Sequence, residues 1–115
     1  MDMERMTIST IGQDSHAFDM TKEKGEYKIR LAGVDVSNSY PISANSDGDV
    51  ILHAITNAIS GYTTRNILGS VADKMCLTEG IKDSAAYLNV GLEDLKSKDA
   101  KILHVSISVE CKRPK

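Results

Sequence analysis

Residues 45–53 read Asn-Ser-Asp-Gly-Asp-Val-Ile-Leu-His, a polar stretch that passes directly into an apolar run. Ser46, with Asp49 three residues later, resembles a capping box, in which side chains satisfy the first backbone amides of a helix. The apolar residues that follow recur at helical spacing and are Ile51, Leu52, Ile55, Ala58 and Ile59. This stretch therefore predicts a helix over residues 47–60.

Two strand-type segments precede this helix. Residues 7–18 and 27–36 read as strands, and the charged residues 21–26 between them are typical of a turn. Two strands joined by a short turn predict an antiparallel hairpin.

A second helix and a further strand are predicted downstream. Asp83 or Ser84 is a suitable N-cap for a helix that ends before residues 98–101. Its apolar positions are Leu88, Leu92 and Leu95. Residues 102–111 alternate strictly between apolar and polar side chains and predict a half-buried strand. Together these elements indicate an α/β (α+β) arrangement of strands and helices.

Length and charge limit the possible classes of protein. A chain of 115 residues makes a single domain, 1–115, and its net charge of −2 provides no basic stripe for nucleic acid. The acidic start does not resemble a signal peptide, and no apolar run has the length of a membrane span. Cys76 and Cys111 form no Cys-x-x-Cys pair, so we expect reduced thiols in a soluble, cytoplasmic protein.

Three residues from two elements form a candidate metal site. Asp14 and His16 are two residues apart, so an extended backbone places both side chains on one face, where His53 of the helix can complete a triangle. Three protein ligands leave a fourth position open, as at a catalytic zinc site, although two histidines and a carboxylate also suit non-haem iron. Asp49 precedes His53 by one helical turn and either orients its imidazole or forms an ordinary surface ion pair.

Polar and cationic positions offer candidate anion contacts. Asn45 and Ser46 precede the predicted helix, where exposed amides favour an anion, although a plain N-cap is the simpler interpretation. Lys112, Arg113 and Lys115 make the end of the sequence locally cationic, which suits a phosphate-bearing small molecule.

Six stretches of the sequence carry a family resemblance. They are Gly-Gln-Asp-Ser-His-Ala-Phe at 12–18, Leu-Ala-Gly-Val at 31–34, the run 45–54 that ends in His-Ala, Asn-Ile-Leu-Gly at 66–69, Asp-Ser at 83–84, and the predicted strand that ends in Arg-Pro-Lys at 113–115. In these motifs and their spacing the chain resembles, over essentially its whole length, the 2-C-methyl-D-erythritol 2,4-cyclodiphosphate synthase family of the non-mevalonate isoprenoid pathway. The run 45–54 is the specific motif among them.

The resemblance implies a fold, an assembly and a reaction. The fold is a mixed β-sheet with helices packed on one face, and the assembly is a homotrimer with active sites between neighbouring subunits. The reaction is that of a phosphorus-oxygen lyase, which converts 4-diphosphocytidyl-2-C-methyl-D-erythritol 2-phosphate to the cyclic diphosphate plus CMP.

The resemblance also implies roles for particular residues. Asp14, His16 and His53 match the zinc ligands of the family, with one Zn²⁺ per subunit, and Mg²⁺ is expected with the substrate. Asn45 and Ser46 match catalytic positions at the transferring phosphate. The implied substrate-binding positions are Asp14, His16, Asn45, Ser46, Cys111, Lys112, Arg113 and Lys115.

Departures from the family pattern bear on activity. Asn45 replaces a histidine at the phosphate, and an amide can donate a hydrogen bond but carries no charge. Ile67 replaces the aspartate that grips the ribose diol, and residues 72–76 replace a loop near the substrate. The family continues beyond the position of Lys115, so we expect the domain to be incomplete at its C-terminus. The alternative is a non-catalytic zinc-binding or regulatory protein derived from the same family.

Overall fold

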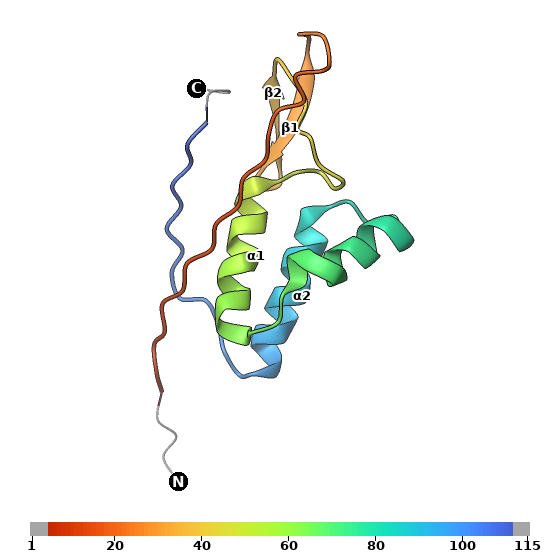
Figure 1. The fold of residues 1–115 in the computed structure, drawn as a ribbon. Coiled ribbons are helices and arrows are strands. Elements are labelled where there is room, and N and C mark those ends of the chain that lie inside the picture. Colours follow the sequence, from red (N-terminus) through yellow and green to blue (C-terminus); the bar gives the residue numbers. More distant parts are fainter. Residues whose placement is uncertain (1–4, 112–115) are drawn as a thin grey trace.

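The computed structural model describes residues 5–111, which form an antiparallel hairpin at one end of two long helices (Figure 1). The elements are β1 (Tyr27–Leu31), β2 (Val34–Asn38), α1 (Val50–Thr63), η1 (Ile67–Val71), η2 (Lys74–Thr78) and α2 (Ser84–Ser97). The two short elements η1 and η2 are single helical turns, and η1 is kinked at Leu68 and Gly69. The expected α+β fold is confirmed. The sheet within the described residues is a two-stranded antiparallel hairpin and not the mixed sheet that we expected.

The hairpin is built from one predicted strand that folds back on itself. β1 and β2 pair from Tyr27 with Asn38 to Leu31 with Val34, so the turn lies inside the predicted strand 27–36. Its two loop residues, Ala32 and Gly33, have φ values of 53° and 80°. A two-residue hairpin loop with positive φ at both positions matches the right-handed twist of the strands.

A carboxylate that is distant in the sequence stabilises this loop. The local sequence pattern therefore did not predict the turn. Asp49 accepts hydrogen bonds from the backbone N–H of Ala32 at 2.9 Å and of Gly33 at 2.6 Å. A non-glycine residue in the left-handed region costs about 1–2 kcal/mol, and two hydrogen bonds to a buried carboxylate offset that cost. The turn therefore depends on a tertiary contact.

The predicted strand 7–18 is wrong as a partner in a hairpin. Within the described residues this segment is extended, and its ladder contact is a single antiparallel bridge between Phe18 and Ile42. It runs along α1 in Figure 1, where Thr10 Oγ1 donates to Ala58 O at 2.7 Å and Asn57 Nδ2 donates to Gln13 O at 2.9 Å. The segment is thus fixed by a helix instead of a neighbouring strand.

Helix α1 begins three residues later than predicted. Its N-cap is Asp49, whose side chain accepts from Leu52 N, whereas the hydroxyl of Ser46 accepts from Gly48 N at 3.3 Å in the preceding turn. The predicted capping box of Ser46 and Asp49 is therefore wrong. The buried residues of α1 are His53, Thr56, Ile59 and Thr63, so a partly polar face points into the protein.

Helix α2 begins after the predicted cap, because the Asp83 side chain accepts from Ala85 N. Gly91 is buried against α1, and a Cβ at this position would lie 3.3 Å from both Ile59 Cγ2 and Ile67 Cδ1. This glycine lets the two helices approach closely. The adjoining core cluster consists of Ile67, Ala72, Cys76 and Tyr87.

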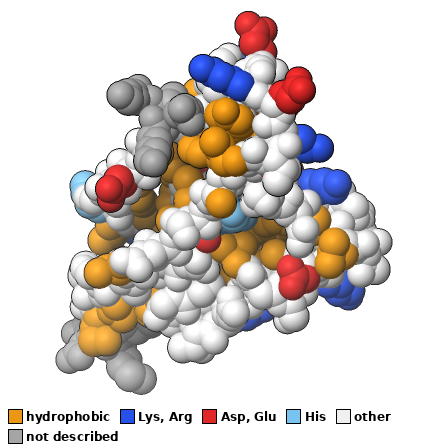
Figure 2. Space-filling view, turned by 45° about the horizontal axis from the view of Figure 1, so that its top comes forward, with side chains coloured by type: hydrophobic (Ala, Val, Ile, Leu, Met, Phe, Trp, Pro, Cys, Tyr) orange, Lys and Arg blue, Asp and Glu red, His pale blue; other side chains and the backbone are white. Residues whose placement is uncertain are grey.

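Residues 102–111 differ from the expected half-buried strand. They are extended but belong to no strand of the described part of the chain, and both of their faces are exposed. Figure 2 shows hydrophobic side chains spread over the surface of the molecule, and the large exposed ones in this segment are Ile102, Leu103, Val105, Ile107 and Val109. None of the described helices is long and apolar enough to cross a membrane.

Candidate metal centre

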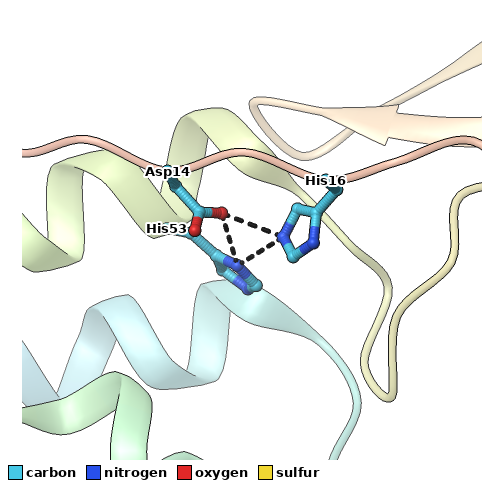
Figure 3. A group of neighbouring side chains, drawn as sticks. All are labelled: Asp14, His16 and His53. Atoms are coloured by element: carbon cyan, nitrogen blue, oxygen red, sulfur yellow. Dashed lines mark hydrogen bonds and ion pairs between the residues drawn. The ribbon is translucent and has the colours of Figure 1, made fainter.

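Asp14, His16 and His53 point toward one another from two elements (Figure 3). Asp14 Oδ2 lies 2.9 Å from His16 Nε2 and 3.1 Å from His53 Nδ1, and the two imidazole nitrogens are 3.1 Å apart. Asp14 and His16 come from the extended segment along α1, and His53 comes from the first turns of α1. The predicted triangle is therefore present in the structure.

The size of this triangle fits a small metal ion. Zinc–nitrogen and zinc–oxygen bonds are about 2.0–2.1 Å long, so neighbouring ligand atoms of a tetrahedral site are about 3.3 Å apart. The observed edges of 2.9–3.1 Å approach that value. One ligand atom from each of the three residues lies within 4.8 Å of the other two, so the group could hold a metal ion. Two imidazoles and a carboxylate are suitable donors for zinc or iron.

The triangle lies on the wall of a cavity of about 190 Å³. The cavity is also lined by the amide of Asn45, the hydroxyl of Ser46 and the thiol of Cys76. Asp14 and His16 keep about a fifth of their side-chain surface exposed, 21% and 19%, whereas His53 keeps 9%. A small ligand in the cavity can thus approach the open side of the triangle.

Asn45 and Ser46 lie where an anion in the cavity would meet them. The backbone at Asn45 is held by Cys76, whose Sγ donates to Asn45 O at 3.1 Å. The interpretation of these two residues as a plain N-cap is wrong, since Asp49 caps α1.

Tyr87 also lines the cavity. Its hydroxyl donates to Ile81 O at 2.5 Å, and the residue is almost completely buried. Burial raises the pKa of Tyr87 above its ordinary range, and a hydrogen bond with Cys76 raises it further. The phenol is therefore neutral at physiological pH and adds no charge to the cavity.

The expected orienting role of Asp49 is not what the structure shows. Its carboxylate accepts from the backbone amides of Ala32, Gly33 and Leu52. The ring nitrogen of His53 that faces away from the triangle, Nε2, instead lies 2.7 Å from Ser84 Oγ. Ser84 was considered from sequence as a helix cap, and its contact with a residue 31 positions away carries no local sequence signal.

The remaining predicted positions are more remote or are not described. Cys111 is exposed at the end of the described residues, and Lys112, Arg113 and Lys115 lie outside them. Ile67, at the position of the ribose-binding aspartate of the resembled family, is fully buried in the core.

Comparison with known proteins gives one family. The model of the YgbB family matches residues 7–115. The 2-C-methyl-D-erythritol 2,4-cyclodiphosphate synthases of Chlamydia caviae and Chlamydia abortus are each 50% identical to this chain over 105 residues, which is 91% of this chain and 58% of each relative. The enzyme of Chlamydia trachomatis serovar L2b is 43% identical over the same length. The chain thus spans less than two thirds of the length of these relatives.

Solved structures give the same result for the fold. A structure of 2C-methyl-D-erythritol-2,4-cyclodiphosphate synthase superimposes with a TM-score of 0.68 at 26% sequence identity, covering 82% of this chain and 59% of that chain. A CDP-bound form of a synthase with the same name has the same TM-score at 24% identity. The arrangement of hairpin and helices is therefore shared with this enzyme.

Proposed function

The chain belongs to the YgbB family, and from this membership we propose that it is a 2-C-methyl-D-erythritol 2,4-cyclodiphosphate synthase, or the part of one that carries its metal centre. The substrate is 4-diphosphocytidyl-2-C-methyl-D-erythritol 2-phosphate, and the products are the cyclic diphosphate and CMP. The reaction is a step of isoprenoid biosynthesis.

One observation carries the proposal. Asp14, His16 and His53 converge with edges of 2.9–3.1 Å on the wall of a cavity that Asn45 and Ser46 also line. This arrangement combines a set of metal donors with uncharged hydrogen-bonding groups on one small cavity. Such a combination suits the positioning of phosphate groups.

The chemistry requires the neutralisation of negative charge. An oxygen of the 2-phosphate attacks the β-phosphorus, the bond from that phosphorus to the bridging oxygen breaks, and CMP leaves with that oxygen. Both reacting groups are anionic, so their approach is unfavourable without cations. A divalent metal held by Asp14, His16 and His53 would supply positive charge for the phosphate oxygens.

The residues of the chain itself bind and orient the reacting groups. Asn45 can donate from its amide and Ser46 from its hydroxyl to phosphate oxygens within the cavity. A cavity of about 190 Å³ is smaller than the 300–1,000 Å³ typical of drug-sized ligands, so it suits a phosphate or diphosphate group. We assign the cytidine to contacts outside this cavity, including the positions Cys111, Lys112, Arg113 and Lys115.

We assign zinc to the triangle of Asp14, His16 and His53. These residues would supply three protein ligands, two imidazoles and one carboxylate, which is the number that catalytic zinc sites use. Mg²⁺ would be held mainly by the diphosphate oxygens of the substrate, which match its preference for oxygen ligands. Metal analysis of the purified chain by mass spectrometry distinguishes zinc from iron.

We also propose a cytoplasmic homotrimer. The resemblance to the family is the basis of this proposal. The exposed apolar side chains of residues 102–109 support an assembly in general, because a partner surface that covers them removes apolar area from water. Light scattering coupled to size-exclusion chromatography tests the assembly, with a trimer expected and a strict monomer as the contrary result.

The test of the activity is CMP release from the named substrate in the presence of zinc and magnesium. We expect release by the wild-type chain above a His53→Ala control. Metal binding without CMP release would favour the second candidate, a non-catalytic zinc-binding relative. The observations that favour it are Asn45 in place of a histidine and the complete burial of Ile67.

A further inference from the structure

A hydrogen-bonded chain of three side chains leads away from the metal triangle. His53 Nε2 lies 2.7 Å from Ser84 Oγ, and this hydroxyl donates in turn to Asp47 Oδ1. Ser84 is completely buried and His53, taken as a whole residue, is 7% exposed, so water does not readily replace these contacts. The three residues come from the turn before α1, from α1 itself and from the first position of α2.

The donors around Asp47 determine the direction of this chain. Its carboxylate accepts from Asp49 N at 3.0 Å and from Ser84 N at 3.0 Å, in addition to the Ser84 hydroxyl. Arg30 Nε lies 3.8 Å from Asp47 Oδ2 and adds positive charge on the same side. An ionised carboxylate only accepts hydrogen bonds, so the hydroxyl proton of Ser84 points to Asp47.

This direction fixes the proton on His53. Because the Ser84 hydroxyl gives its own proton to Asp47, it meets the imidazole with a lone pair, and Nε2 of His53 must carry a proton to donate. A neutral imidazole protonated at Nε2 has a bare lone pair at Nδ1. Nδ1 is the atom that faces Asp14 and His16.

We propose that Ser84, oriented by Asp47, is a positioning residue that holds His53 as the Nε2–H tautomer and so presents Nδ1 to the metal ion. This inference rests on the proposed metal-dependent function. Partners on the far nitrogen of a ligating histidine fix its tautomer and ring orientation and strengthen the metal bond.

A purely structural role for the Ser84 hydroxyl does not account for these contacts. The N-cap of α2 is Asp83, which accepts from Ala85 N, so the helix does not need the Ser84 hydroxyl as a cap. The backbone amide of Ser84 already fixes Asp47 without the hydroxyl. The hydroxyl thus serves the contact between Asp47 and His53.

The first test reads the tautomer directly in the wild-type chain. Long-range ¹H–¹⁵N correlation spectra of the metal-free, histidine-labelled protein at mildly alkaline pH distinguish a protonated Nε2 from a protonated Nδ1. We expect the proton of His53 on Nε2. A proton on Nδ1, with Nε2 accepting from Ser84, would overturn the proposal without any variant being made.

The second test compares two serine variants in zinc affinity, measured by competition with a chromophoric chelator. Ser84→Ala is expected to weaken zinc binding about 10–100-fold, the usual effect of removing such a partner. Ser60→Ala is the matched control, because Ser60 Oγ is buried on α1 without a hydrogen-bond partner among residues 5–111. Its affinity should equal that of the wild type, and Ser84→Thr, which keeps the hydroxyl, should bind more tightly than Ser84→Ala.

Failure of this inference is distinguishable from failure of the proposed function. A wild-type chain that binds no zinc would refute the proposed metal site whatever the tautomer. Zinc binding of unchanged strength in a folded Ser84→Ala chain would refute the positioning role of Ser84 alone.

Discussion

Gly12 lies against Ala54 of α1 so closely that a Cβ at position 12 would come 1.8 Å from the Ala54 carbonyl oxygen and 2.4 Å from Ala58 N. Both of those atoms belong to helix backbone and cannot move aside. Gly12 therefore sets how near the segment that carries Asp14 and His16 comes to the helix that carries His53. The metal triangle depends on this approach.

Gly12→Ala should displace that segment from α1. We expect a loss of stability of about 1–3 kcal/mol, as for other overpacking substitutions. Because Asp14 and His16 move with the segment, zinc affinity should fall about tenfold or more. Urea denaturation and chelator competition measure the two effects.

The control for this prediction is Gly61→Ala, since Gly61 lies on α1, the helix that Gly12 contacts. A Cβ there would lie 3.5 Å from Thr10 Cβ, an ordinary contact with the same N-terminal segment. Zinc affinity should stay unchanged in this variant. An equal loss in both variants would show that the contact at Gly12 has no special part in the metal site.

His53→Ala should remove most of the bound metal and leave the fold in place. A helix tolerates alanine well, and the variant loses a ligand together with the contact to Ser84. Metal content by mass spectrometry and helix content by circular dichroism provide the readouts. His104→Ala is the matched control, since His104 is exposed and contacts Ser106, and full metal occupancy in His53→Ala would refute the assignment of the site.

The metal triangle was predictable although the strand assumed for it was wrong. Asp14 and His16 share a face because any extended backbone repeats every two residues, whether or not it is paired in a sheet. The helix that carries His53 follows from the polar-to-apolar transition at residues 45–53, and an error of three residues in its start does not move His53 off it. Local geometry thus accounts for the shared face of Asp14 and His16 and for the helix of His53, whereas the resemblance to the family joined the three residues into one ligand set.

Features that depend on distant partners were not predictable in the same way. The turn at Ala32 and Gly33 relies on Asp49, and the tautomer of His53 relies on Ser84, in each case across more than a dozen residues. Residues 102–111 have the alternation of a strand, but alternation does not identify the surface that a strand covers. In the described chain both faces of that segment are exposed.

Asp49→Asn separates the observed role of Asp49 from the role expected from sequence. The substitution leaves an amide N–H₂ group facing one of three backbone donors, so we expect a loss of stability of about 1–3 kcal/mol. Zinc affinity should remain within about twofold of the wild type, because the His53 ring contacts Ser84 and not Asp49. A large loss of zinc affinity with little loss of stability would instead support an orienting role for Asp49.

Tyr87 should make the stability of the protein sensitive to alkaline pH. Its pKa is raised in the folded state by burial, so the folded chain holds this proton more tightly than the unfolded chain does. The resulting stability is fully present below the unfolded pKa of about 10 and is lost as the pH rises toward the folded value. Tyr87→Phe removes the hydrogen bond to Ile81 O, at a cost of about 1 kcal/mol near neutrality, and also removes this part of the pH dependence. Thermal unfolding of the wild type and of Tyr87→Phe, measured between neutral and strongly alkaline pH, checks this prediction. The difference in stability between the two proteins should shrink as the pH rises. Two parallel curves would mean that Tyr87 ionises as easily in the folded chain as in the unfolded one.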